Sequence, residues 1–78
     1  MESIDPDHYK TEYGIETIDA IRAALGLEGF VAYCRGQIIR YTWRLGKKDD
    51  ALVEIGKASV YADWIKDTLD GKPLRKMR

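Results

Sequence analysis

The sequence has a single cysteine, a single histidine and no long hydrophobic run. One cysteine cannot form an internal disulfide, and on its own it cannot make a zinc site. No apolar stretch approaches the ~20 residues that a membrane-spanning helix needs, so we expect no membrane partner. The first residues are acidic where a secretory signal would be basic and then apolar, which favours a cytoplasmic location.

The familiar phosphate-binding and metal-binding motifs are also missing. Gly46 and Lys47 would belong to a P-loop only with a glycine five positions earlier and a Ser or Thr directly after them, but Tyr41 and Lys48 occupy those places. Neither G-x-G-x-x-G nor H-E-x-x-H occurs. Any phosphate chemistry therefore requires a different geometry.

The absence of net charge conceals an uneven distribution of charge. Residues 1–29 hold seven acids and two bases, residues 30–48 hold five bases and no acid, and the remainder holds six of each. The basic middle segment suits a phosphate-bearing small molecule or an acidic surface of the same protein. Five bases in a neutral chain are too few for a typical nucleic-acid footprint, so we expect no nucleic-acid partner.

At 78 residues the chain is one small domain, 1–78, with little apolar surface to bury. Helical spacing of its apolar residues predicts an all-α fold, a small three-helix domain with an ordered N-terminal arm. The expected segments are the arm at 1–14, helices at 15–25, 28–46 and 50–69, and a flexible tail at 70–78. Because so short a chain is marginally stable alone, we also expect a helical homo-oligomer.

The central helix carries three stripes of residues at steps of three and four. The stripe expected in the core is Phe30, Cys34, Ile38, Tyr41 and Leu45. There Cys34 is interpreted as a buried thiol in preference to a nucleophile. The polar stripe beside it, a candidate ligand site, is Tyr33, Gln37, Arg40 and Arg44. The apolar stripe on the opposite side, a candidate contact with a second chain, is Ala32, Ile39 and Trp43.

The flanking helices have less distinctive patterns. In the first helix, Ile18, Ile21 and Leu25 are expected to face inward. In the last helix the expected inward stripe is Ala51, Ile55, Ala58, Ala62, Ile65 and Leu69, and the opposite apolar set is Val53, Val60 and Trp64. Between them Glu54, Lys57 and Tyr61 form either a solvated, salt-bridged edge or a set of ligand contacts.

Five further side chains have both a structural and a functional interpretation. Glu16 and Asp19 lie three apart in the first turns of a helix, where they either complement the helix dipole or hold Mg²⁺ beside a phosphate. Lys47 and Lys48 either stabilise the end of the central helix or contact phosphates. His8, in the arm, is either a packing or capping group or a catalyst, because it is the one side chain type here that titrates near neutrality unperturbed. Gly36 lies inside the predicted helix, where glycine lowers helix stability, so we expect another helix or a ligand to approach it closely.

Several separated motifs, in this order, match a known pattern. They are Asp5-Pro-Asp-His8-Tyr9, Gly14-Ile15-Glu16-Thr-Ile18-Asp19, Phe30-x-x-Tyr33-Cys34-x-Gly36-x-x-x-Arg40-Tyr41-x-x-Arg44-x-Gly-Lys47-Lys48, and Lys57-Ala58 with Tyr61. Over residues 5 to 65 the chain resembles the SaV-like family of small phage proteins. It is also similar to the C-terminal part of a phage kinase of deoxynucleoside monophosphates that lacks a P-loop. In the family a Gly-Asn pair is usual in the central helix, where this chain has Gly36 and Gln37.

The resemblance implies a phage protein of nucleotide metabolism in the cytoplasm of a bacterial host. It implies that the chain binds a nucleotide and phosphorylates deoxynucleoside monophosphates with ATP and Mg²⁺. Candidate nucleotide-binding residues are Tyr33, Gln37, Arg40, Arg44, Lys47, Lys48 and Tyr61. Candidate catalytic residues are His8, Glu16 and Asp19, the last two also as Mg²⁺ ligands. The alternatives are a non-catalytic protein that sequesters a signalling nucleotide, and one that binds a host protein to counter host defence.

Overall fold

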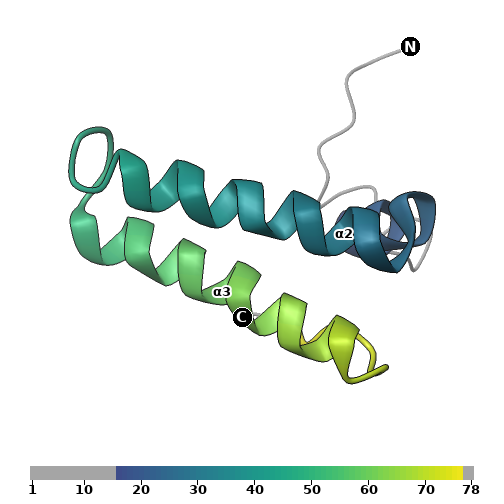
Figure 1. Ribbon diagram of the computed structural model, residues 1–78. Helices are drawn as coiled ribbons and strands as arrows, with labels where there is room; N and C mark the ends of the chain where they lie inside the picture. Colours follow the sequence, from purple (N-terminus) through teal and green to yellow (C-terminus); the bar gives the residue numbers. More distant parts are fainter. Residues whose placement is uncertain (1–15, 77–78) are drawn as a thin grey trace, which may run out of the picture.

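Two antiparallel helices form the body of the protein. The computed structural model describes residues 16–76, and these residues contain α2, Thr17–Trp43, and α3, Ala51–Leu69, with no strand. The two helices lie side by side, joined by a turn at one end (Figure 1). The predicted all-α class is confirmed. The predicted arm falls outside the described residues.

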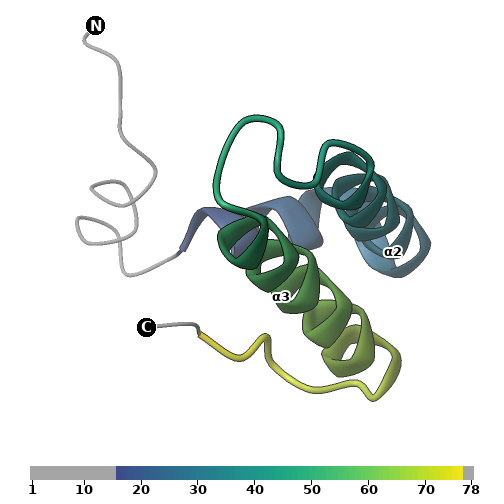
Figure 2. The ribbon, with the colours of Figure 1, turned by 90° about the vertical axis from the view of Figure 1, so that its left-hand side faces the viewer.

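The first helix contains a break where two helices were expected. Gly26 has φ 76° and ψ 177°, a conformation open essentially to glycine alone, and helical geometry resumes directly after it. The helices predicted at 15–25 and 28–46 therefore correspond to two helical segments of one continuous element, α2, which meet at Gly26. Figure 2 shows the turns before the break crossing the direction of the rest of α2. In place of three separate helices the described residues hold two.

The connection between the helices is short and ends in a helix cap. α2 ends at Trp43, earlier than the expected residue 46, and Gly46 in the turn has a positive φ of 78°. The Asp50 carboxylate accepts a hydrogen bond from the Leu52 N–H at 3.3 Å, a standard N-terminal cap for α3. This turn fixes the antiparallel direction of α3.

The core lies between the bent first helix and the C-terminal part of α3. Phe30, Cys34 and Leu74 form its fully buried cluster, and Ile18 and Ile21 pack against it. The partly buried residues Tyr33, Tyr61, Trp64 and Ile65 pack against it as well. The prediction that Phe30, Cys34 and Tyr41 share a buried face is confirmed. Leu25 and Leu45, expected to point inward, are 48% and 42% exposed.

The inward face of α3 differs from the predicted one. Its buried residues are Glu54, Ala58, Asp67 and Thr68. Of the expected stripe, Ile55 and Leu69 are 43% and 65% exposed, whereas Glu54 is 0% exposed. Ala58 and Ile65 of the expected stripe do pack inward, but the acids Glu54 and Asp67 are buried as well, and apolar spacing does not reveal their partners.

The C-terminal segment is packed, contrary to the flexible tail expected at 70–78. Leu74 is 3% exposed in the core cluster, and Arg75 forms an ion pair with Asp67 at 2.6 Å. Lys76 pairs with Asp19, in the first turn of α2, at 2.7 Å. Residues 70–76 therefore tie the end of α3 to the beginning of α2.

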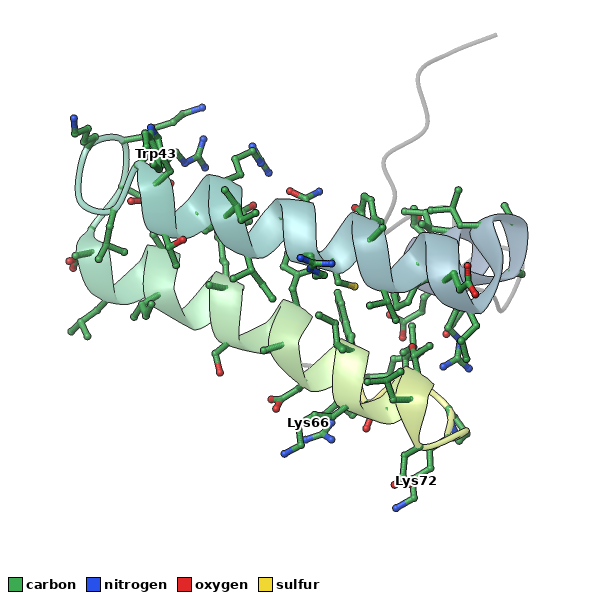
Figure 3. The ribbon with its side chains drawn as sticks, in the orientation of Figure 1. Trp43, Lys66 and Lys72 are labelled. Carbon is green, nitrogen blue, oxygen red and sulfur yellow. The ribbon has the colours of Figure 1, made fainter. Side chains whose placement is uncertain are left out.

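The outer side of α2 is apolar and uncovered in the single chain. Trp43 is 86% exposed and Ile39 is 59% exposed. Figure 3 places Trp43 on the side of α2 turned away from α3, and Lys66 and Lys72 on the far side of α3. The homo-oligomer expected from this face stays a prediction. Neither of the two described helices is both long enough and apolar enough to cross a membrane.

Candidate functional site

Four aromatic side chains gather where α2 and α3 face each other. Tyr33 and Tyr41 come from α2, and Tyr61 and Trp64 from α3. The Tyr41 and Tyr61 rings are stacked with centroids 6.1 Å apart. Tyr61 meets Trp64 edge to face at 5.3 Å and meets Tyr33 at 6.1 Å. Such contacts hold aromatic rings in defined orientations.

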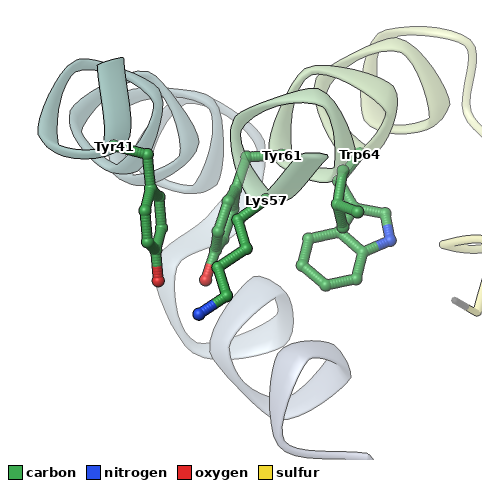
Figure 4. A pocket seen from close by; sticks show the side chains of 5 residues that line it. Tyr41, Lys57, Tyr61 and Trp64 are labelled. Carbon is green, nitrogen blue, oxygen red and sulfur yellow. The ribbon is translucent and has the colours of Figure 1, made fainter. Parts of the chain in front are cut away.

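A pocket of about 270 Å³ opens beside these rings. It is lined by Tyr41, Lys57, Val60, Tyr61 and Trp64. The side chains of Tyr41, Lys57, Tyr61 and Trp64 point to the same side of the helix pair (Figure 4). Its walls are mainly apolar, with the Lys57 ammonium at its edge. The volume lies slightly below the range of about 300 to 1,000 Å³ that is usual for small-molecule sites. It suits one planar ring better than a whole large ligand.

Three cations surround the Tyr41 ring. The Arg40 and Arg44 guanidinium carbons lie 4.7 and 5.0 Å from the ring centroid, and the Lys57 ammonium lies 5.6 Å from it. Each cation–π contact of this kind contributes about 0.5 to 1 kcal/mol when exposed. Because Arg44 is paired with Glu54 at 3.0 Å, Arg40 and Lys57 are the two cations that make the surroundings of this ring attractive to an anion.

A chain of hydrogen bonds along α2 orients one of these cations. Gln37 Nε2 donates to the Tyr33 hydroxyl at 3.0 Å, and Arg40 Nε donates to Gln37 Oε1 at 2.9 Å. Arg40 also donates to the Tyr41 hydroxyl at 3.1 Å. The structure thus brings together Tyr33, Gln37 and Arg40, three of the residues that the sequence placed in one ligand-binding stripe.

Arg44, the fourth residue of that stripe, is engaged with an acid. Its Nε lies 3.0 Å from Glu54 Oε2, and the Gly46 N–H donates to Glu54 Oε1 at 2.7 Å. Because Glu54 is fully buried, this pair locks the interhelix turn to the first turn of α3. Arg44 therefore stabilises the interhelix turn, whether or not it also contacts a ligand. Lys47 and Lys48 are exposed in the same turn.

The two predicted acids lie at the other end of the molecule. Glu16 is the N-cap residue of α2, and both oxygens of Asp19 accept from Lys76, at 2.9 and 2.7 Å. The straight part of α2, residues 27–43, is about 25 Å long at 1.5 Å per helical residue, and the two acids precede its beginning whereas Arg44 follows its end. His8 lies outside the described residues.

This arrangement does not fit the predicted Mg²⁺ site. Both oxygens of Asp19 are already bound to an ammonium, and residues 16–76 contain no cluster of three or more metal-ligating side chains.

Comparison with known proteins identifies the family. Residues 4–63 match the model of a family described as a protein of unknown function, DUF3310. The chain belongs to the DUF3310 family. The matched residues include α2 and most of α3, and with them the three cations around Tyr41. They end one residue before Trp64.

Two curated relatives of this DUF3310 chain come from phages. The gene 1.7 protein of Enterobacteria phage T3 is 33% identical over 61 residues, which are 74% of this chain and 37% of the relative. Nucleotide kinase gp1.7 of Escherichia phage T7 is 35% identical over 65 residues, 83% of this chain and 33% of the relative. The chain thus spans about a third of the length of these relatives. No solved structure matches it.

Burial tunes the acid–base chemistry of two side chains in this DUF3310 domain. Burial raises the pKa of the Cys34 thiol to about 11, so the thiol stays protonated at neutral pH. Burial, with smaller contributions from Tyr33 and Tyr41, raises the pKa of Tyr61 well above its ordinary value. Tyr61 therefore contributes a hydrogen-bonding hydroxyl and a ring surface, and not a base.

Sequence reasoning missed part of the pocket. Tyr41 was assigned to the core, Val60 and Trp64 to an outer apolar face, and Lys57 was left between two interpretations. The available signal was the spacing of Lys57, Tyr61 and Trp64 at steps of four and three, which places them on one helical face. The sequence did not show that Tyr41 of the other helix packs against that face.

Proposed function

We propose that this chain binds a nucleotide in the aromatic pocket and belongs to phage nucleotide metabolism. The observation that carries the proposal is the group of three cations around Tyr41, directly beside a pocket walled by aromatic rings. The name of the phage T7 relative, nucleotide kinase, agrees with it. The resemblance of the sequence to SaV-like phage proteins agrees with the phage origin of both relatives.

The two halves of a nucleotide match the two halves of this site. A base packed on an aromatic side chain gains about 1 to 3 kcal/mol, and the flat walls formed by Tyr61 and Trp64 offer such a surface. A phosphate prefers guanidinium and ammonium groups; Lys57 supplies one in the pocket lining, and Arg40 supplies one over the Tyr41 ring beside it. Within the described chain, Lys57 and Arg40 have no carboxylate partner, so neither must break an ion pair to accept a phosphate.

Calorimetry with each of the four deoxynucleoside monophosphates tests the binding site. Lys57→Met keeps a long apolar side chain and removes the charge, so affinity should fall about tenfold, the loss of one charge-assisted contact. Lys66→Met is the matched control, because Lys66 lies on the far side of α3 (Figure 3). Absence of binding by the native chain, or equal loss in both variants, would overturn the proposal.

Arg44 is a poor choice for the same test. Removing its side chain leaves the buried Glu54 carboxylate with the Gly46 N–H as its one described partner, and an uncompensated buried charge is costly. A loss of binding in Arg44→Ala would therefore report a damaged turn as readily as a lost contact. Substitutions of Lys57 or Arg40 remove a ligand contact without breaking the ion pair that holds the turn.

Phosphoryl transfer is the further part of the proposal. It consists of transfer from ATP to a deoxynucleoside monophosphate, and its support is the name of the T7 relative and the cations that would face the phosphates. Formation of the diphosphate from ATP, Mg²⁺ and any of the four monophosphates would establish it. If His8 is the general base, His8→Ala should lower turnover and leave nucleotide affinity unchanged.

A non-catalytic nucleotide binder is the second candidate. The observation that favours it is the ion pair between Asp19 and Lys76. Within the described part of the chain, both oxygens of this predicted metal ligand already bind the Lys76 ammonium. Tight binding of a nucleotide with no product under the same conditions would select it. Such a protein would act by sequestering its ligand in the host cytoplasm.

A further inference from the structure

The segment after α3 turns back and runs alongside that helix (Figure 2). We call residues 70–76 the C-terminal strap. Gly71 has φ 69° and opens the reversal, and Leu74 anchors the strap by burying its side chain against Phe30 and Cys34. The strap is thus part of the folded unit, although the aromatic pocket is formed by α2 and α3.

Arg75 fixes the strap to α3 through one carboxylate. Its backbone N–H and its Nε donate to Asp67 Oδ2 at 3.0 and 2.9 Å, and a terminal nitrogen donates to Asp67 Oδ1 at 2.6 Å. A terminal nitrogen also lies 3.6 Å from Asp63. The Asp67 side chain is 7% exposed, so water competes little for these bonds. Three hydrogen bonds from one residue hold both its backbone and its side chain in place.

The backbone held in this way accepts a hydrogen bond from a wall of the pocket. Trp64 Nε1 donates to the Arg75 carbonyl at 2.7 Å. This nitrogen is the only hydrogen-bond donor of an indole, so the bond determines how the ring is turned. The same ring lines the pocket and packs edge to face on Tyr61.

We infer that the C-terminal strap positions Trp64 as a wall of the ligand pocket, and that Asp67 is a positioning residue that acts through Arg75 and Trp64. The inference rests on the proposed function, since it assigns the strap to the same site. When the strap is loosened, the indole gains rotational freedom that a ligand must remove on binding. Immobilising one such side chain costs affinity by a factor of about 2 to 10.

The position of the indole is measured directly by its fluorescence. The chain has two tryptophans, so Trp43→Phe makes Trp64 the only reporter. In that background Asp67→Asn should increase acrylamide quenching of Trp64. The matched control is Asp70→Asn, which removes the exposed ion pair of Asp70 with Lys72, three residues further along the chain. Equal quenching in the two variants would overturn the inference.

Binding of the four deoxynucleoside monophosphates tests the consequence for the site. Asp67→Asn should weaken calorimetric affinity about fivefold, and Trp64→Phe, which keeps an aromatic ring and loses the N–H, should weaken it similarly. If Asp67 acts through Trp64, the double variant should be no weaker than Trp64→Phe alone. Ala62→Gly destabilises exposed helix without removing a strap contact, and its affinity should match that of the native chain.

The outcomes separate this inference from the proposed function. Additive losses in the double variant would show that Asp67 supports the fold only, which overturns the positioning role while native binding stands. If the native chain binds none of the four nucleotides, the proposed function fails. The quenching comparison then still decides whether the strap holds the indole.

Discussion

At the scale of single residues, Cys34 shows how burial controls reactivity. Burial raises the pKa of its thiol to about 11, and the thiolate is the reactive form. We expect the native chain at pH 8 to react with iodoacetamide at least about a hundredfold more slowly than the urea-unfolded chain. Mass spectrometry after timed quenching measures both rates. Comparable rates in the two states would show that Cys34 is accessible and would contradict the buried interpretation.

The same scale shows why some positions were predictable and others were not. Phe30, Cys34 and Tyr41 were assigned to the core because apolar side chains at helical spacing are buried on one face. Glu54 was assigned to an edge, and it is buried because Arg44 and the Gly46 N–H both bind it. A carboxylate is buried only when distant groups satisfy it, and those partners follow from the folded turn, not from the period of the helix.

At the scale of elements, two glycines of α2 have opposite roles. Gly26 has φ 76° and produces the bend, whereas Gly36 is in ordinary helix, and a methyl group added there would meet nothing within 4 Å. Gly36→Ala should therefore stabilise the chain by about 1 kcal/mol, and Gly26→Ala should destabilise it by about 1 to 3 kcal/mol. Urea unfolding followed by circular dichroism measures both free energies of unfolding.

The two variants serve as controls for each other, because each makes the same chemical change in one helix. A stabilising Gly26→Ala would mean that α2 is straight in solution. A destabilising Gly36→Ala would mean that another helix or a ligand approaches this position, as the sequence analysis expected. From the sequence, the bend could be predicted only as a turn between two helices. The spacing of apolar residues marks where a helix is interrupted, but it does not show how many residues leave the helical conformation.

The candidate site is also a feature of packed elements, and only part of it was predictable. The stripe of Tyr33, Gln37 and Arg40 belongs to one helix and follows from its period. The stacking of Tyr41 on Tyr61 depends on how far α3 is rotated about its own axis. The period of α3 alone does not fix that rotation, so the sequence predicted neither the burial of Glu54 nor the place of Trp64 in the pocket wall.

At the scale of the whole molecule, the strap makes stability depend on pH. Hydrogen bonds from the side chain and backbone of Arg75 hold the pKa of Asp67 far below its ordinary value of about 3.9, and Lys72 adds to this effect. Because the pKa is lower in the folded state, the stabilisation is present above about pH 4 and is lost as the pH falls below it. The free energy of unfolding should therefore decrease in acid.

Asp67→Asn isolates this contribution from those of the other carboxylates. The variant should be less stable than the native chain at pH 7, and the difference should shrink as the pH falls from about 4 towards 2, because this carboxyl binds protons at a higher pH in the unfolded chain than in the native chain. Urea midpoints over this range measure the difference, and Asp70→Asn, on the exposed pair, should show little dependence. A difference between native and Asp67→Asn that is the same at both extremes of pH would contradict the assignment.

The outer face of α2 bears on how many chains act together. Trp43 is 86% exposed and Ile39 is 59% exposed, and large apolar side chains on one face of a small domain favour association. We expect the native chain to form a homo-oligomer through this face, and Trp43→Glu to dissociate it by placing a charge in the contact. Light scattering coupled to size exclusion reports the mass of each, and Lys66→Glu, on the far side of α3, is the control. If the native chain proves to be a monomer, the prediction is wrong. The Trp43 indole then lies in water, and the fluorescence emission of Trp43 is at the long wavelength typical of a solvated indole.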